Sequence, residues 1–208
     1  RRQRQMCIRD RPRRMNTMKT KLCLLILLIV GLSVQLSANP INGLLERIDK
    51  GASKKFVIEF KKGADDFFEL DQKGTKVVVR GNNYVNIATG INWYLKYYAG
   101  IQLSWNGMQA KLPQVLPPVP RKERHETSLS LRYDFNYCTY SYTMAFWDWE
   151  RWEKEIDWMA MHGINMPLSI TGMEVFWYNL LKRIGYTTEE INEFISGPAF
   201  MAWWQMNN

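Results

Sequence analysis

Two short runs of polar and aromatic side chains each follow a segment with the pattern of a β-strand. The first run, 136–142, contains Asn136 and Cys138, and the second, 171–174, ends in Glu174. An amide both donates and accepts hydrogen bonds, and a lone cysteine commonly packs as a small apolar group. Glu174 is the carboxylate best placed for catalysis, although an acid in a first helical turn also interacts favourably with the helix dipole.

The elements that would position these runs form a strand, a helix and a second strand. Residues 129–136 alternate between apolar and polar side chains, which predicts a strand, and 164–170 reads as a buried strand. Between them the spacing predicts a helix of about four turns that begins at Asp148 and ends at Gly163. Its apolar face would carry Trp149, Trp152, Ile156, Met159 and Ala160. Such a βαβ unit implies parallel pairing, with functional residues at the carboxyl ends of the strands.

Residues 39–112 predict a small α+β domain. Helical spacing covers 41–51 and 85–98, and strand patterns cover 54–61, 66–70 and 75–80. Residues 113–126 are rich in proline and charge, and we interpret them as an extended linker. A second domain, 127–208, would then hold the βαβ unit, a helix at 173–184 and a short helix that a capping box starts at Thr187.

The N-terminal residues are expected to lie outside the folded part. Residues 1–17 are a basic extension, non-native or disordered, for which a nucleic-acid-binding arm is the functional alternative. Residues 18–38 have the short positive start, apolar run and small residues of a signal peptide, with cleavage near Ala38. The apolar run is too short for a stable membrane anchor, so we expect export to the periplasm, the cell surface or the medium.

Charge and composition exclude several classes of function for the mature chain. The formal charge of +8 comes from residues 1–17 together with Lys19 and Lys21, so the chain from Asn39 onward is neutral and indicates no nucleic-acid partner. Of the three cysteines, Cys138 alone belongs to the mature part, which therefore has no internal disulfide. His125 and His162 lie far apart, without ligand spacing, so no metal site is expected.

The second domain resembles a known enzyme family. Its motifs include Asn136-x-Cys138-Thr139, the run Trp147-Asp148-Trp149-x-Arg151-Trp152 continuing to Ala160, Gly163-Ile164-Asn165, and the segment from Glu190 to Phe200. These resemble the alpha-N-acetylglucosaminidases, family 89 of the glycoside hydrolases, over about 75 residues. Residues 40–125 are similar to the small N-terminal domain of the family, more loosely.

The resemblance implies an α/β protein in which the small α+β domain is followed by the beginning of a (β/α)8 TIM barrel, truncated here. It implies hydrolysis of terminal alpha-linked N-acetylglucosamine from glycans, with retention, by two glutamates that lie beyond residue 208; the fragment alone would be inactive. Asn136, Cys138, Trp203 and Met206 match positions that line the sugar pocket, with core packing as the alternative for the last three. The resemblance supports the dipole interpretation of Glu174, and it implies no cofactor.

A protein of a different class remains as an alternative. A non-catalytic carbohydrate-binding or adhesion protein would also present aromatic side chains at a surface. The oligomeric state cannot be predicted from the sequence.

Overall fold

The computed structural model describes residues 39–197, 199–200 and 203–204 of the 208-residue chain. The expectations for the basic extension and the signal peptide therefore lie outside the described residues, as does Met206. Within the described part, no helix is long and apolar enough to cross a membrane.

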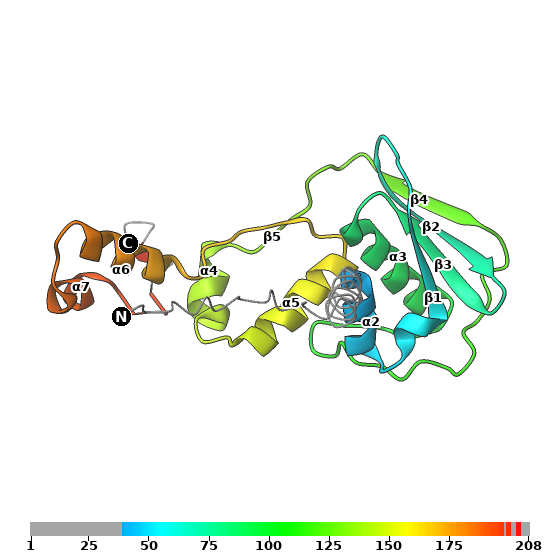
Figure 1. Ribbon diagram of the computed structural model, residues 1–208, viewed down its shortest axis with the longest axis horizontal. Helices are drawn as coiled ribbons and strands as arrows, with labels where there is room; N and C mark the ends of the chain where they lie inside the picture. Colours follow the sequence, from blue (N-terminus) through cyan, green and yellow to red (C-terminus); the bar gives the residue numbers. More distant parts are fainter. Residues whose placement is uncertain (1–38, 198, 201–202, 205–208) are drawn as a thin grey trace, which may run out of the picture. The chain divides into compact units, whose positions relative to one another are not determined.

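The first domain is a four-stranded sheet with helices packed on it. Its elements are α2 (Pro40–Ile48), the 3-10 helix η1 (Ala52–Lys55), β1 (Phe56–Phe60), β2 (Asp66–Lys73), β3 (Lys76–Gly81), α3 (Tyr84–Tyr97) and β4 (Glu123–Thr127). The strand order is β1-β3-β2-β4; β1 and β3 are parallel, and the other pairs are antiparallel (Figure 1). The small α+β domain predicted from the sequence is present.

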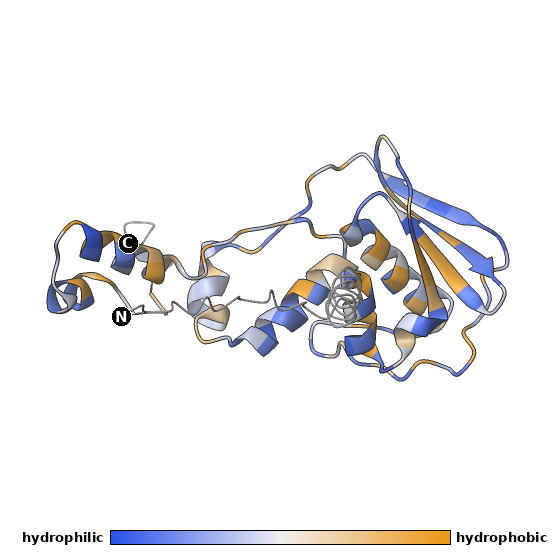
Figure 2. Ribbon diagram, in the orientation of Figure 1, coloured by the Kyte–Doolittle hydropathy of each residue, from blue (hydrophilic) through white to orange (hydrophobic). Residues whose placement is uncertain are grey.

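One apolar core holds this domain together. In Figure 2 the hydrophobic residues of α3 lie beside those of the strands. Tyr94 and Leu95 of α3 and Val79 of β3 are fully buried. Gly90 of α3 is required by this close packing, because a Cβ there would lie 2.9 Å from Val79 Cγ1. The helix begins at Asn83, whose side chain accepts a hydrogen bond from the Asn86 N–H at 2.9 Å.

The segment 113–126 differs from the extended, solvated linker that its prolines and charges suggested. Leu116 and Val119 are buried in the core of the first domain, and the Pro117 carbonyl accepts a hydrogen bond from the Tyr94 hydroxyl at 2.5 Å. Its last residues belong to β4, which pairs with β2. The charged side chains of β4 concealed this strand in the sequence pattern, yet one of them lies on a ring of β2: the Arg124 guanidinium is 3.6 Å from the Phe67 ring centroid.

The second part contains the predicted βαβ unit. Its elements are β5 (Tyr133–Asp134), α4 (Tyr137–Thr139), the π-helix η2 (Tyr140–Met144), α5 (Trp149–Met161), β6 (Met166–Pro167), α6 (Met173–Arg183) and α7 (Thr188–Phe194). β5 and β6 pair in parallel, as expected. Both strands are shorter than the predicted 129–136 and 164–170, because a strand is defined by its partner and only two residues of each are paired. The described residues form no closed barrel.

The buried face of α5 differs from the prediction. Trp149 and Ile156 are exposed, whereas Glu155, Asp157 and Met161 are buried. The cause is the first domain, against which α5 packs: Met161 joins its core, and Arg47 of α2 makes two hydrogen bonds to the Asp157 carboxylate at 2.6 and 2.7 Å. Carboxylates that are paired in this way can be buried, although a periodicity argument assigns them to solvent.

Candidate functional site

The carboxyl end of β5 carries an unusual backbone conformation. Phe135, directly after the strand, has φ 73°, and it is the only residue other than glycine in the described ranges with positive φ. Its N–H donates to Asp134 Oδ1 at 2.8 Å, and its ring is buried. A bulky residue in this region is strained and persists only where its surroundings hold it, which is common at functional sites. The chain is thereby turned sharply before Asn136.

Asn136 has one end of its amide occupied and the other available. Its Oδ1 accepts the Thr139 N–H at 3.1 Å, and Thr139 Oγ1 accepts the Asn136 N–H at 3.4 Å, which is a capping box for α4. The side chain is exposed, and none of its hydrogen bonds to described residues uses Nδ2. The amide N–H groups are therefore free to donate to a ligand.

Cys138 lies two residues further along the chain, in α4, and is exposed. Its interpretation as a small buried hydrophobe is therefore wrong for the described part of the chain.

A tyrosine joins the carboxyl ends of the two strands. Tyr140, in η2, is buried, and its hydroxyl donates to the Leu168 carbonyl just after β6. Burial raises the pKa of this hydroxyl, so it remains a proton donor at all physiological pH values. The π-helix is itself a feature found frequently at functional sites. Sequence reasoning missed the roles of Phe135 and Tyr140; the run of aromatic residues after Asn136 was a signal that could have indicated Tyr140.

Trp203 reaches this edge from the C-terminal end of the described chain. Its ring is half-buried, and its centroid lies 6.1 Å from that of Tyr142, at an interplanar angle of 76°. Tyr142 is 81% exposed, so most of its ring is available to a ligand. The structure thus brings Trp203 to the segment that carries Asn136 and Cys138, while Met206 lies outside the described residues.

Glu174 occupies the first turn of α6, as the dipole interpretation requires. The helix follows Gly172, which has φ 82° and provides no side-chain cap. Glu174 is half-buried and makes no ion pair with a described residue.

A separate cleft lies away from the strand ends. It has a volume of about 680 Å³ and is lined by α2, the segment 105–109, α5, and Thr143 and Trp147 from the segment before α5. Its charged side chains largely pair with one another, as Arg47 does with Asp157 and Lys154 with Glu150. We therefore place the candidate site at the carboxyl ends of β5 and β6 and not in this cleft.

The arrangement at the strand ends provides binding groups: amide N–H donors, a thiol and aromatic rings that can lie against an apolar face of a ligand. Among the described residues, no group of three His, Cys, Asp or Glu side chains is placed to hold a metal ion. The chemistry suits a ligand that carries both hydroxyl groups and C–H faces.

Comparison with family models gives two adjacent matches. Residues 39–118 match the N-terminal domain of alpha-N-acetylglucosaminidase, and residues 132–208 match its TIM-barrel domain. The first match covers the sheet domain except β4, and the second begins at Arg132, directly before β5.

Individual relatives are similar to this chain over about four fifths of its length. The human alpha-N-acetylglucosaminidase is 41% identical over 160 residues, which are 77% of this chain and 22% of the human protein. A family 89 glycoside hydrolase from Clostridium perfringens, solved in complex with PUGNAc, is also 41% identical, with a TM-score of 0.77 over 82% of this chain. A variant of that enzyme, with two glutamates replaced by glutamine, was solved with its substrate GlcNAc-alpha-1,4-galactose. This chain spans about a fifth of the length of these relatives.

Proposed function

The chain belongs to the alpha-N-acetylglucosaminidases of glycoside hydrolase family 89, and on this premise we propose that the protein of which it forms part removes terminal alpha-linked N-acetylglucosamine from glycans. The observation that carries the proposal is the family match over residues 132–208, because that range contains the strand ends at which the exposed polar and aromatic side chains meet. The substrate named for the Clostridium relative, an alpha-1,4-linked GlcNAc–galactose disaccharide, supports the same class of glycan.

In this proposal the described residues bind the terminal sugar. The free amide N–H groups of Asn136 donate to a sugar hydroxyl or acetamido oxygen, and Cys138 lies beside that contact on α4. Trp203 presents its ring to the C–H face of the pyranose, as aromatic residues commonly do with sugars. Met206 is assigned to the same pocket by the resemblance alone.

The chemical step is proposed to use two glutamates from the part of the protein that follows residue 208. A retaining mechanism needs two carboxyl groups about 5–5.5 Å apart, one as acid and then base, the other as nucleophile. The paired glutamate replacements in the substrate complex of the Clostridium relative support this assignment. Residues 1–208 alone are then expected to be inactive, because they supply binding groups without that pair.

We also propose that the protein is exported, as the signal-peptide pattern of residues 18–38 predicts. N-terminal sequencing of the protein from its natural host would give a first residue close to Asn39 if cleavage follows Ala38. A protein that begins at Met18 or earlier would contradict both the cleavage and the export.

The test of function uses the full-length mature protein. It should release p-nitrophenol from the alpha-linked N-acetylglucosaminide and not from the beta-linked one, and NMR of the first-formed product should show the alpha anomer of the free sugar. A beta anomer would contradict retention only. A folded full-length protein that binds N-acetylglucosamine without hydrolysis would instead support the alternative of a non-catalytic carbohydrate-binding protein.

A further inference from the structure

The pairing of β5 with β6 is too short to fix its own alignment. Two residues of each strand are paired, and Tyr133, Met166 and Pro167 are exposed, so the paired residues themselves offer no buried face that fixes the register; the buried or half-buried neighbours are the flanking Phe135, Ile164 and Leu168. Registers are weakly specified under these conditions. A slip by one residue would move Asn136 by about 3.3 Å along the strand and turn it to the other face.

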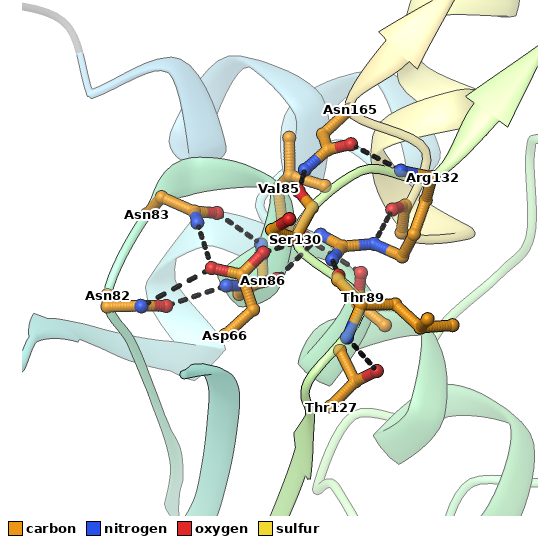
Figure 3. Close-up of polar contacts among 12 residues, drawn as sticks. Asp66, Asn82, Asn83, Val85, Asn86, Thr89, Thr127, Ser130, Arg132 and Asn165 are labelled. Atoms are coloured by element: carbon orange, nitrogen blue, oxygen red, sulfur yellow. Dashed lines mark hydrogen bonds and ion pairs between the residues drawn. The ribbon is translucent and has the colours of Figure 1, made fainter. Parts of the chain in front are cut away.

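Arg132, directly before β5, supplies the missing constraint (Figure 3). Its Nε donates to the Gly163 carbonyl in the turn that precedes β6, and Nη1 donates to the Leu129 carbonyl at 2.5 Å. Nη2 forms an ion pair with Asp66 Oδ2 at 2.8 Å and donates to Asn86 Oδ1 at 3.3 Å. One planar guanidinium thus joins the entry of β5, the entry of β6, and both β2 and α3 of the small domain.

Asn165 completes the clamp from the side of β6. Its Oδ1 accepts the Arg132 N–H at 2.8 Å, and its Nδ2 donates to the Ser130 carbonyl at 2.9 Å. An asparagine at 165 can make both bonds only in the observed alignment, because a shifted strand would place a different backbone group opposite each end of the amide.

The small domain holds its side of the clamp rigidly. Asp66 Oδ1 accepts from Asn83 Nδ2 at 3.1 Å and from Asn82 Nδ2 at 3.4 Å. The C-terminal end of α5 is fixed to α3 of the small domain. Thr89 and Asn92 of α3 donate hydrogen bonds to the carbonyls of Ala160 and Met161, at 3.3 and 3.1 Å. The Ala160 carbonyl also accepts the Gly163 N–H at 3.3 Å, whereas the Met161 carbonyl accepts from Asn92 of the small domain.

We propose that Arg132 is a positioning residue for the sugar-binding edge: it fixes the register of β5 on β6 from the small domain and so sets where Asn136 and Cys138 lie. The inference rests on the proposed function for its catalytic consequence. Asn136 follows Arg132 by only four residues. A shift of β5 would therefore move Asn136 as well, through the strained backbone of Phe135.

The variant that tests this is Arg132→Lys in the full-length protein, which retains the charge beside Asp66 but cannot bond to four acceptors at once. The matched control is Arg47→Lys.

Arg47 also bridges the small domain and the βαβ unit through a carboxylate, but its partner Asp157 lies on α5, away from the strand entries. Both variants should lower Tm. At a temperature where both are fully folded, we expect kcat/KM on the p-nitrophenyl substrate to fall about 10- to 100-fold for Arg132→Lys and to stay unchanged for Arg47→Lys.

Hydrogen exchange gives a second readout that does not depend on activity. The N–H groups of Asn165, Met166 and Leu168 donate to the carbonyls of β5 and its entry, and Arg132→Lys should accelerate their exchange, whereas Arg47→Lys should not. Asn165→Ala should reproduce the effect and replaces Arg132→Lys if that variant does not fold. Equal losses of Tm with unchanged kcat/KM and unchanged exchange at 165–168 would overturn the proposal. An inactive wild-type protein would refute the proposed function, while the exchange result would still decide whether Arg132 fixes the register.

Discussion

The indole N–H of Trp105, in a loop of the small domain, donates to the buried carboxylate of Glu155 in α5 at 2.7 Å. Glu155 is 1% exposed, and its second partner is Arg151, 2.9 Å away on the same helix. The Arg151 guanidinium in turn lies against the rings of Trp105 and Trp147. A charge that the sequence assigned to solvent is therefore held inside the junction of the two domains.

The first prediction concerns this bond. Trp105→Phe keeps an aromatic ring against Arg151 and removes the N–H donor, which should lower the free energy of unfolding by about 1.5–3 kcal/mol. Calorimetry on the full-length protein measures the effect. Tyr97→Phe is the control, because Tyr97 is 57% exposed on α3 and its change should stay within about 0.5 kcal/mol. Equal effects of the two substitutions would show that the buried hydrogen bond contributes little.

Local signals were sufficient for α3, α5 and α7, although the short helices η1, α4 and η2 were not predicted. The capping box of Thr187 and Glu190, the N-cap at Asp148 and the spacing in α3 all depend on residues within a few positions of one another, and the structure contains each of them. Strand β4 was missed because its evidence is not local: its charged side chains become partly buried only when it pairs with β2.

The candidate site was also predictable only as far as local patterns describe it. The position of Asn136 and Cys138 after a strand could be read from the alternation of residues 129–136. The bond from the Tyr140 hydroxyl to the Leu168 carbonyl, just after β6, joins residues 28 positions apart, and no local pattern encodes either this bond or the positive φ of Phe135. The buried face of α5 was mispredicted because the small domain, not the strand pair alone, decides which side is covered.

The second prediction concerns Glu69 and pH. Burial acts to raise the pKa of this carboxyl, but hydrogen bonds from Lys61, Lys122 and Arg124 outweigh it and lower the pKa to about 2 from 4.5. A depressed pKa means that the ionised network contributes its full stability above about pH 4.5 and loses it as the pH falls toward 2. The difference in Tm between the wild type and Glu69→Gln should be constant from pH 6 to 7, about two units above the ordinary pKa, and should shrink below pH 4.5. A difference that is independent of pH would show that the network does not depend on the charge of Glu69.

The third prediction separates backbone conformation from packing at Gly163. This residue has φ 80°, and a Cβ would meet Thr89 Oγ1 at 3.4 Å, an ordinary contact. The conformation and not the space therefore requires glycine, and Gly163→Ala should cost about 1–2 kcal/mol. Gly163→Asn should cost less, because asparagine tolerates positive φ, although it is the larger side chain. Thermal unfolding of both variants decides: a greater loss for asparagine would mean that packing is the cause. Gly90→Ala provides the opposite case, since its loss of stability would come from the close contact of the added Cβ with Val79.

The fourth prediction divides the two roles of the Asn136 amide. Asn136→Asp keeps the oxygen that accepts the Thr139 N–H and removes the N–H donors, so the cap of α4 survives while the proposed bond to the sugar is lost. In the full-length protein we expect an unchanged Tm and a KM for the p-nitrophenyl substrate that rises about 3- to 10-fold, the cost of one hydrogen bond. Asn136→Ala removes both the oxygen that caps α4 and the N–H donors. It should lower the free energy of unfolding by about 1 kcal/mol in addition to raising KM. Because the structure accounts for the oxygen and leaves the nitrogen free, only the nitrogen is available for substrate; a wild-type KM for Asn136→Asp would therefore remove Asn136 from the sugar site and leave it as a helix cap.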